Sequence, residues 1–121
     1  MSGKSFILAV DHNRRNLELL DQFLGQAGYQ TILAASMEDF DQVMAKGEEI
    51  ALALVDLAGF DKSIWQCCEQ LRDRNIPLFI ISPRHNATIK ATSIAHGAQS
   101  VLVKPLVVRE LLGIIRELIE D

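Results

Sequence analysis

The chain of 121 residues has no long hydrophobic run, no excess of positive charge and only two cysteines, and each shortage excludes a class of protein. No apolar run approaches the roughly 20 residues that a membrane-spanning helix needs. The amino terminus lacks the basic-then-apolar pattern of a signal peptide, since Asp11 follows a short apolar run. The formal net charge is -4, so no overall field favours nucleic acid or an anionic membrane. We therefore expect no membrane partner and no direct contact with nucleic acid.

The two cysteines, Cys67 and Cys68, are adjacent in the sequence and cannot easily bridge each other within a regular helix. We interpret them as small core hydrophobes in a reducing compartment, which predicts a cytoplasmic protein. What the chain does have is 49% hydrophobic and 23% charged residues, which is a globular, soluble composition. The length suits one domain, and no repeat, low-complexity tract or linker interrupts it. We expect a single domain over residues 1–121.

Five short, unbroken apolar runs recur along the chain. Strands that are buried on both faces have such runs, whereas half-exposed strands alternate between apolar and polar residues. The five runs therefore predict buried strands at FILAV (6–10), TILAA (31–35), IALALV (50–55), PLFII (77–81) and SVLV (100–103).

The segments between these runs carry apolar residues at helical spacing. Leu17, Leu20 and Leu24 share one face of a first helix, and Gly28 is its C-terminal stop. Ser36 is the expected N-cap of a second helix, with Asp39 in capping-box position. The later helices are marked by Ile64, Cys68 and Leu71, then by Ile94 and Ala95 before Gly97, and then by Val108, Leu111, Leu112, Ile115 and Leu118.

Five strands that alternate with five helices imply a parallel sheet with helices on both faces. We predict a doubly wound α/β fold. In such sheets, ligands bind outside the carboxyl ends of the strands, where the strand order reverses. The residues at those strand ends are therefore the candidates for function.

Polar residues stand at four of the five strand ends: Asp11-His12, Asp56, Ser82 and Lys104-Pro105. Taken singly each is ordinary, because an aspartate that leaves a strand is often a turn or capping residue. Together they have complementary chemistry. A carboxylate can accept a phosphoryl group as a nucleophile, and a second acid can help to hold Mg²⁺. A hydroxyl and an ammonium group can bind the oxygens of the transferred group. The set matches phosphoryl transfer onto aspartate.

In these residues and in its order of strands and helices, the chain from Phe6 to the last helix resembles the receiver domains of bacterial two-component response regulators. The resemblance implies a flavodoxin-like receiver fold with the sheet order 2-1-3-4-5. The stretches that carry it are Asp11 after the first strand, Asn16 in the next helix, VDL around Asp56, IIS ending at Ser82, and GAQSVLVKP from Gly97 to Pro105.

The roles of the site residues follow from that resemblance. It implies that Asp56 is the phosphoacceptor, that Ser82 is the switch hydroxyl, and that Lys104 acts in the chemistry. Lys104 would precede a cis peptide bond, which is essentially confined to proline. A weakly bound Mg²⁺ would be held by Asp11, Asp56 and the backbone carbonyl of Ala58. The domain would be a signalling phosphoacceptor that catalyses at most its own phosphotransfer and dephosphorylation.

The resemblance also implies partners. A histidine kinase or a phosphotransfer protein would supply the phosphoryl group. An output domain or a partner protein would bind the face made of the fourth helix, the fifth strand and the fifth helix, and a homodimer is compatible with the pattern. Whether the chain works alone or as a piece of a larger regulator stays open.

The chain departs from the family pattern in the region around the predicted phosphoacceptor. His12 stands where a second acid usually contacts the metal, and imidazole suits zinc, copper or nickel better than magnesium. The alternative is that His12 caps the first helix or faces solvent. After Asp56, Phe60 replaces a usual proline and Ile64 a usual glycine, although Gly59 supplies backbone freedom nearby.

Two further departures concern switching. Val101 occupies the place of an aromatic residue whose rotamer couples to the switch hydroxyl, and valine has one dominant rotamer and little reach. Pro83 stiffens the loop directly after Ser82. These departures leave two hypotheses open, namely a working receiver and a receiver-like interaction module that needs no phosphate. A flavodoxin-like cofactor binder is disfavoured, because no Gly-rich phosphate loop follows the first strand and Arg14 and Arg15 do not replace one.

Overall fold

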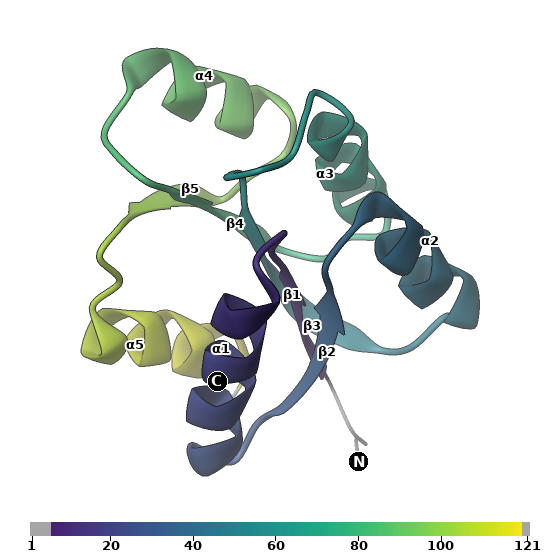
Figure 1. Cartoon of the computed structure of the whole chain (residues 1–121), viewed down its shortest axis with the longest axis vertical. Helices are drawn as coiled ribbons and strands as arrows, with labels where there is room; N and C mark the ends of the chain where they lie inside the picture. Colours follow the sequence, from purple (N-terminus) through teal and green to yellow (C-terminus); the bar gives the residue numbers. More distant parts are fainter. Residues whose placement is uncertain (1–5, 120–121) are drawn as a thin grey trace.

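One sheet of five parallel strands forms the centre of the molecule, in the order β2-β1-β3-β4-β5 (Figure 1). The structure is a computed structural model that describes residues 6–119. The prediction of a doubly wound α/β fold with this strand order is confirmed. The strands are β1 (Phe6–Val10), β2 (Gln30–Ala34), β3 (Ile50–Asp56), β4 (Leu78–Ser82) and β5 (Ser100–Val103).

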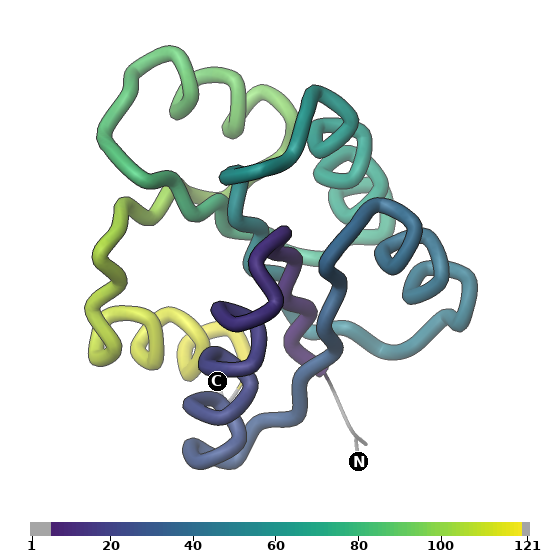
Figure 2. The backbone as a smooth tube through the Cα atoms, viewed as in Figure 1, coloured from purple at the N-terminus to yellow at the C-terminus, as the bar shows by residue number. Residues whose placement is uncertain are grey.

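Five helices connect the strands and cover both faces of the sheet. The backbone trace in Figure 2 shows α1 and α5 next to each other on one side, with α2 and α3 on the other. The helices are α1 (Arg14–Gln26), α2 (Met37–Lys46), α3 (Ile64–Asp73), α4 (Ala87–Ala95) and α5 (Val108–Ile119).

Alternate residues of the central strands form two separate cores. On one face, Leu8, Val55 and Ile80 pack with the inner sides of α2 and α3. On the other face, Leu54 and Ile81 pack with α1 and α5. Because both faces are covered, the strands consist of unbroken apolar runs.

The observed bounds of three strands differ from the predicted ones by one residue, at both ends of β2 and β4 and at the end of β3. β2 begins at Gln30, and β3 extends to Asp56. β4 begins at Leu78, because Pro77 has no amide hydrogen to donate and only its carbonyl joins the ladder, as an acceptor from the Ala53 N–H at 2.9 Å. With these bounds, Asp56 is the last residue of β3 and Ser82 is the last residue of β4. The backbone of both residues therefore belongs to the sheet.

The predicted cap of the second helix is confirmed. The Ser36 hydroxyl accepts a hydrogen bond from the Asp39 backbone N–H at 3.0 Å. The Asp39 carboxylate in turn accepts from the backbone N–H of Ala35 at 3.0 Å, so two amides at the start of the helix are satisfied.

The fourth helix is the least buried of the five. Ser93 is its one buried residue, whereas Ile94, which marked this helix in the sequence, is 46% exposed. The helix is therefore rotated so that a small side chain faces the sheet. The Ser93 hydroxyl has no hydrogen-bond partner within residues 6–119.

The two cysteines lie on the inner side of α3 as free, buried thiols, in agreement with their interpretation as core residues. Burial raises the pKa of both, that of Cys68 to about 12, so neither is a reactive thiolate at neutral pH. Within residues 6–119, no helix is both long enough and apolar enough to cross a membrane.

Candidate functional site

The predicted site residues lie at one edge of the sheet. Asp11 directly follows β1, Asp56 ends β3, Ser82 ends β4, and Lys104 directly follows β5. All strands are parallel, so these four positions share the carboxyl edge, and β1 marks the place where the strand order reverses. The expectation that these residues share one edge of the sheet is met.

Asp56 and Lys104 form a short ion pair. Lys104 Nζ lies 2.7 Å from Asp56 Oδ2, and the Asp56 side chain is only 3% exposed, against 33% for Lys104. The other carboxylate oxygen, Oδ1, accepts a hydrogen bond from the backbone N–H of Ala58 at 2.9 Å. A buried carboxylate is tolerated only when its oxygens are paired in this way. The peptide bond between Lys104 and Pro105 is cis, as predicted.

Asp11 is the second acid of the site. Its Oδ1 accepts a hydrogen bond from the backbone N–H of Asn13 at 2.9 Å. Burial raises the pKa of the Asp11 carboxyl, and the negative charge of Asp56 raises it further, while the Asn13 N–H and the Lys104 charge act in the opposite direction. Burial is the largest cause of the raised pKa of Asp11, and the charge of Asp56 adds to it.

This pair of carboxylates fits a hard divalent cation. Carboxylate and carbonyl oxygens are the ligands that Mg²⁺ prefers, and a cation would relieve the repulsion that raises the pKa of Asp11. In the described part of the chain, no group of three or more His, Cys, Asp and Glu side chains gathers so that it could hold a metal. The protein ligands would be two carboxylates and backbone oxygen, and water would complete the shell.

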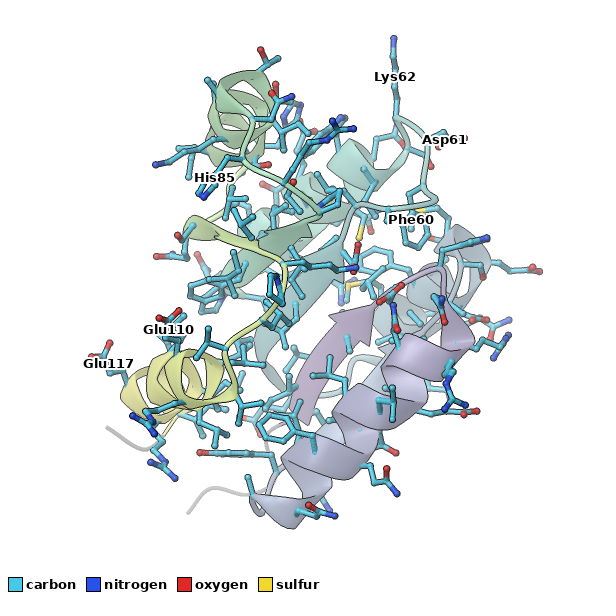
Figure 3. All side chains as sticks on the ribbon, turned by 60° about the vertical axis from the view of Figure 1, so that its left-hand side comes forward. Phe60, Asp61, Lys62, His85, Glu110 and Glu117 are labelled. Carbon is cyan, nitrogen blue, oxygen red and sulfur yellow. The ribbon has the colours of Figure 1, made fainter. Side chains whose placement is uncertain are left out.

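His12 packs over the loop that follows β3. Its ring meets Phe60 edge-on, with centroids 5.9 Å apart (Figure 3 labels Phe60 on this loop). A Cβ atom built on Gly59 would lie 2.9 Å from His12 Cδ2, so the imidazole rests directly on the glycine backbone. Gly59 has φ +84°, the left-handed conformation that favours glycine. The N-cap of α1 is Asn13, whose side chain accepts from the Asn16 N–H, so His12 does not cap the helix.

Ser82 is completely buried, and its hydroxyl is occupied. Ser82 Oγ donates to the backbone carbonyl of Arg84 at 2.8 Å, across Pro83. The Ser82 carbonyl accepts from the backbone N–H of Lys104 at 2.9 Å. The hydroxyl must leave the Arg84 carbonyl before it can bind anything at Asp56.

Val101 lies on β5, opposite Ile80 of β4, and is half-buried. It lines a hollow of about 200 Å³ together with Ser82 and residues of α4. The side chain is too short to fill this space. The switch role of Val101 stays a prediction.

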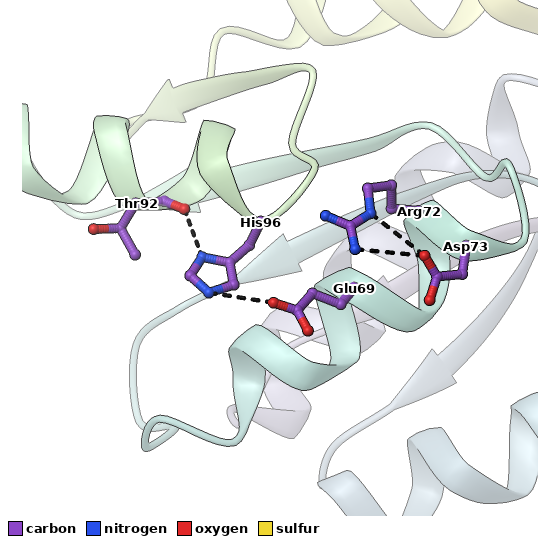
Figure 4. A network of polar contacts seen from close by, with 5 residues as sticks. All are labelled: Glu69, Arg72, Asp73, Thr92 and His96. Atoms are coloured by element: carbon purple, nitrogen blue, oxygen red, sulfur yellow. Dashed lines mark hydrogen bonds and ion pairs between the residues drawn. The ribbon is translucent and has the colours of Figure 1, made fainter.

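Trp65 of α3 packs against the end of α4. Its ring stacks on His96 with centroids 5.1 Å apart, and so joins α3 to the end of α4. His96 Nδ1 lies 2.8 Å from the Thr92 carbonyl oxygen, and Nε2 lies 3.4 Å from Glu69 Oε2 (Figure 4). Sequence reasoning missed this network, because nothing in the spacing of Trp65 and His96 indicates that they meet. It missed the Ala58 N–H for a simpler reason, since every residue but proline has one.

No protein-family model matches the chain. Among curated proteins, it is 30% identical over 122 residues to the transcriptional regulatory protein GltR of Pseudomonas aeruginosa. That alignment covers 98% of this chain and 50% of GltR. The chain spans about half the length of the curated relatives it matches.

Solved structures give closer agreement in length. A CheY-like response regulator receiver domain protein from Methanospirillum hungatei is 26% identical, with a TM-score of 0.80. The match covers 95% of this chain and 93% of that one. The fold also matches a chain in a CheX-CheY complex with BeF₃ and Mg²⁺ from Borrelia burgdorferi, at 21% identity and a TM-score of 0.77. In that case 93% of this chain covers 87% of the other.

Proposed function

Because this chain belongs to the receiver domains of response regulators, we propose that it accepts a phosphoryl group on Asp56 from a histidine kinase or a phosphotransfer protein. The observation that carries the proposal is the ion pair of Asp56 with Lys104. It pairs a buried carboxylate with a cation, at the edge where a doubly wound sheet binds its ligands. In this account residues 1–121 form a single signalling domain.

The chemistry is a displacement at phosphorus. A carboxylate oxygen of Asp56 attacks the phosphorus of a phosphohistidine, the P–N bond breaks, and the imidazole leaves with its electron pair. The product is an acyl phosphate on Asp56. The ammonium group of Lys104 is released from the carboxylate and pairs with phosphoryl oxygen.

Mg²⁺ would be held by Asp11, by Asp56 and by the backbone carbonyl of Ala58. When bound, it neutralises charge on the phosphoryl oxygens. His12 contributes no carboxylate to this set and instead rests on Gly59. We therefore propose a weak magnesium site.

Partners follow from the same account. The donor is a kinase or phosphotransfer protein that presents a phosphohistidine. The names of the curated relatives are those of transcriptional regulators, which supports an output through a further domain or a partner protein. The output partner would bind the surface formed by α4, β5 and α5. A second copy of the chain could be that partner, which would give a homodimer. The proposed location is the cytoplasm.

A second function, as an interaction module that works without phosphate, is favoured by the bond from the Ser82 hydroxyl to the Arg84 carbonyl. The hydroxyl is held there, Pro83 stiffens the loop, and valine at position 101 has little reach. Phosphorylation would therefore cause only a small conformational change. This function uses the same surface but needs no acceptor chemistry.

Incubation with acetyl phosphate and Mg²⁺, followed by intact-mass measurement, distinguishes the two functions. We expect a gain of one phosphoryl group that is absent in Asp56→Asn. The matched control is Asp61→Asn, which removes an exposed acid from the same loop and is expected to leave labelling unchanged. An unlabelled wild-type protein would favour the interaction module, and a labelled Asp56→Asn protein would exclude Asp56 as the acceptor.

A further inference from the structure

The distribution of charge along the chain is strongly uneven. The whole chain has 16 acidic and 12 basic residues. Residues 74–109 contain no Asp or Glu at all, yet they contain five Arg or Lys. This stretch covers β4, α4 and β5. Of the five, Arg74 reaches the Met44 carbonyl of α2 and Lys104 pairs with Asp56, which leaves Arg84, Lys90 and Arg109.

The basic stretch surrounds the hollow beside Val101. Its volume is about 200 Å³, with Arg84, His85 and Lys90 on the polar side. The apolar side is formed by Val101 and Val103 of β5 and by Ile89 of α4. We call this hollow with its basic residues the α4 pocket.

A second hollow of about 260 Å³ continues the α4 pocket toward α5. The two share His85, Val101 and Val103. The second is lined further by apolar residues before and within α5, and Glu110 is its single acidic residue. Figure 3 shows His85 just before α4 and Glu110 on α5. Because they share lining residues, the two hollows lie side by side along the edge strand β5.

The cations of the α4 pocket are available to a partner. Arg84 and Lys90 are both exposed, and within residues 6–119 neither forms an ion pair. By contrast, Lys104 is already paired with Asp56. Two free cations beside an apolar cavity suit a ligand that has negative charge together with an apolar side chain.

We propose that the α4 pocket binds an acidic segment of a partner protein, which inserts one apolar side chain between Ile89 and Val101. The carboxylates of the segment pair with Arg84 and Lys90. Nucleic acid fits less well, because a phosphate backbone has no apolar group for this cavity. A second copy of this chain would have to bring its own acidic surface, such as α2, to the pocket.

The proposal deepens the proposed function by giving the chemistry of the output partner, and it rests on that function only for regulation. Ser82 lines the α4 pocket and also ends the strand beside Asp56. Release of the Ser82 hydroxyl from the Arg84 carbonyl would change the rim of the pocket. Binding of the acidic segment to the unphosphorylated protein needs none of this, so the two claims can fail separately.

The test is an amide NMR titration of the full unphosphorylated chain with a short synthetic peptide that carries one phenylalanine between aspartates and glutamates. We expect saturable shifts at residues 84–90 and 101–103. The double variant R84E/K90E should weaken binding about tenfold, because both attractive ion pairs with the peptide become repulsive. The control R15E/K62E has the same change of net charge away from the pocket and should bind like the wild type.

A second variant tests the cavity rather than the charge. Val101→Phe fills the apolar side of the α4 pocket and leaves all its cations in place. It should therefore weaken binding of the peptide. A peptide with leucine in place of phenylalanine should still bind, and one with glycine there should not.

Several results of these titrations would overturn the proposal. These are the absence of binding at millimolar peptide, equal weakening by R15E/K62E, shifts confined to α1 and α5, and tighter binding of a short DNA duplex at the same residues. Concentration-dependent shifts of the same amides without peptide would also overturn it, in favour of a second copy of the chain.

Discussion

Lys104 Nζ and Asp56 Oδ2 lie 2.7 Å apart, although β4 separates the two strands that carry these residues. The ion pair therefore reaches across β4 and joins the end of β3 to the segment after β5. Other ion pairs among residues 6–119 are longer, at 3.4 Å, and link helical residues. This relationship makes stability and acceptor chemistry depend on the same two side chains.

Lys104→Met is expected to lower the free energy of unfolding by about 2 kcal/mol, since it leaves the Asp56 carboxylate buried without its cation and Lys104 is itself partly exposed. In the Asp56→Asn background the same change should cost much less, because a neutral amide needs no counter-charge. Urea unfolding of the four proteins at neutral pH measures both costs. Equal costs in the two backgrounds would mean that the lysine stabilises the fold by packing alone.

Asp11→Asn is expected to raise the melting temperature at neutral pH without divalent cations. The pKa of Asp11 is raised in the folded protein, so the penalty on its charged form develops as the pH rises above the ordinary value of 3.8. The gain should disappear below that value, where the carboxyl is protonated in both states. Thermal unfolding followed by circular dichroism across this pH range measures it.

Asp61→Asn is the control of opposite sign. Hydrogen bonds from Ser63 lower the pKa of the Asp61 carboxyl, so its stabilisation is present above pH 3.8 and is lost as the pH falls. Its replacement should lower the melting temperature at neutral pH. If both variants shifted the melting temperature in the same direction, the raised pKa of Asp11 would not be its cause.

Gly59→Ala is expected to destabilise the domain by about 1–2 kcal/mol, because φ is +84° there and a Cβ would meet His12 at 2.9 Å. His12→Ala removes the ring contacts and keeps only the Cβ contact at 3.0 Å, so the second substitution should cost less in that background. Gly25→Ala is the matched control, since nothing lies within 4 Å of its position in α1. It should be neutral or stabilising. If Gly59→Ala lowered the free energy of unfolding equally with histidine or alanine at position 12, the His12 ring would not lie against Gly59.

His12→Asp is expected to raise the affinity for Mg²⁺, because it places a second carboxylate beside Asp11. The Mg²⁺ concentration for half-maximal labelling by acetyl phosphate should fall about tenfold. His12→Asn provides a neutral comparison of similar size and should leave that concentration nearly unchanged. The account is wrong about this position if aspartate and asparagine behave alike.

Sequence reasoning reached most of the fold and the four site positions for a simple physical reason. Buried parallel strands are read from unbroken apolar runs, and the residue after each run must lie at one edge. Asp56, Ser82 and Lys104 could therefore be placed together without any knowledge of their contacts. The cis bond before Pro105 followed from the resemblance and is present.

What could not be predicted depends on side-chain direction. His12 lies on Gly59 because the loop after β3 turns back over the site, and no periodic pattern describes a loop. Ser93 rather than Ile94 faces the sheet because a short helix with few apolar residues has no strong preference for one face. The stack of Trp65 on His96 likewise depends on how two helices approach each other.

The central claim is that Asp56 carries an acyl phosphate, and reductive trapping tests it most directly. Borohydride converts an aspartyl phosphate to homoserine and leaves serine or histidine phosphates unreduced. After incubation with acetyl phosphate and Mg²⁺, peptide mass mapping should find homoserine at position 56 and aspartate at positions 11 and 61. Homoserine at another aspartate, or a phosphoryl group that resists reduction at Ser82 or a histidine, would contradict the account.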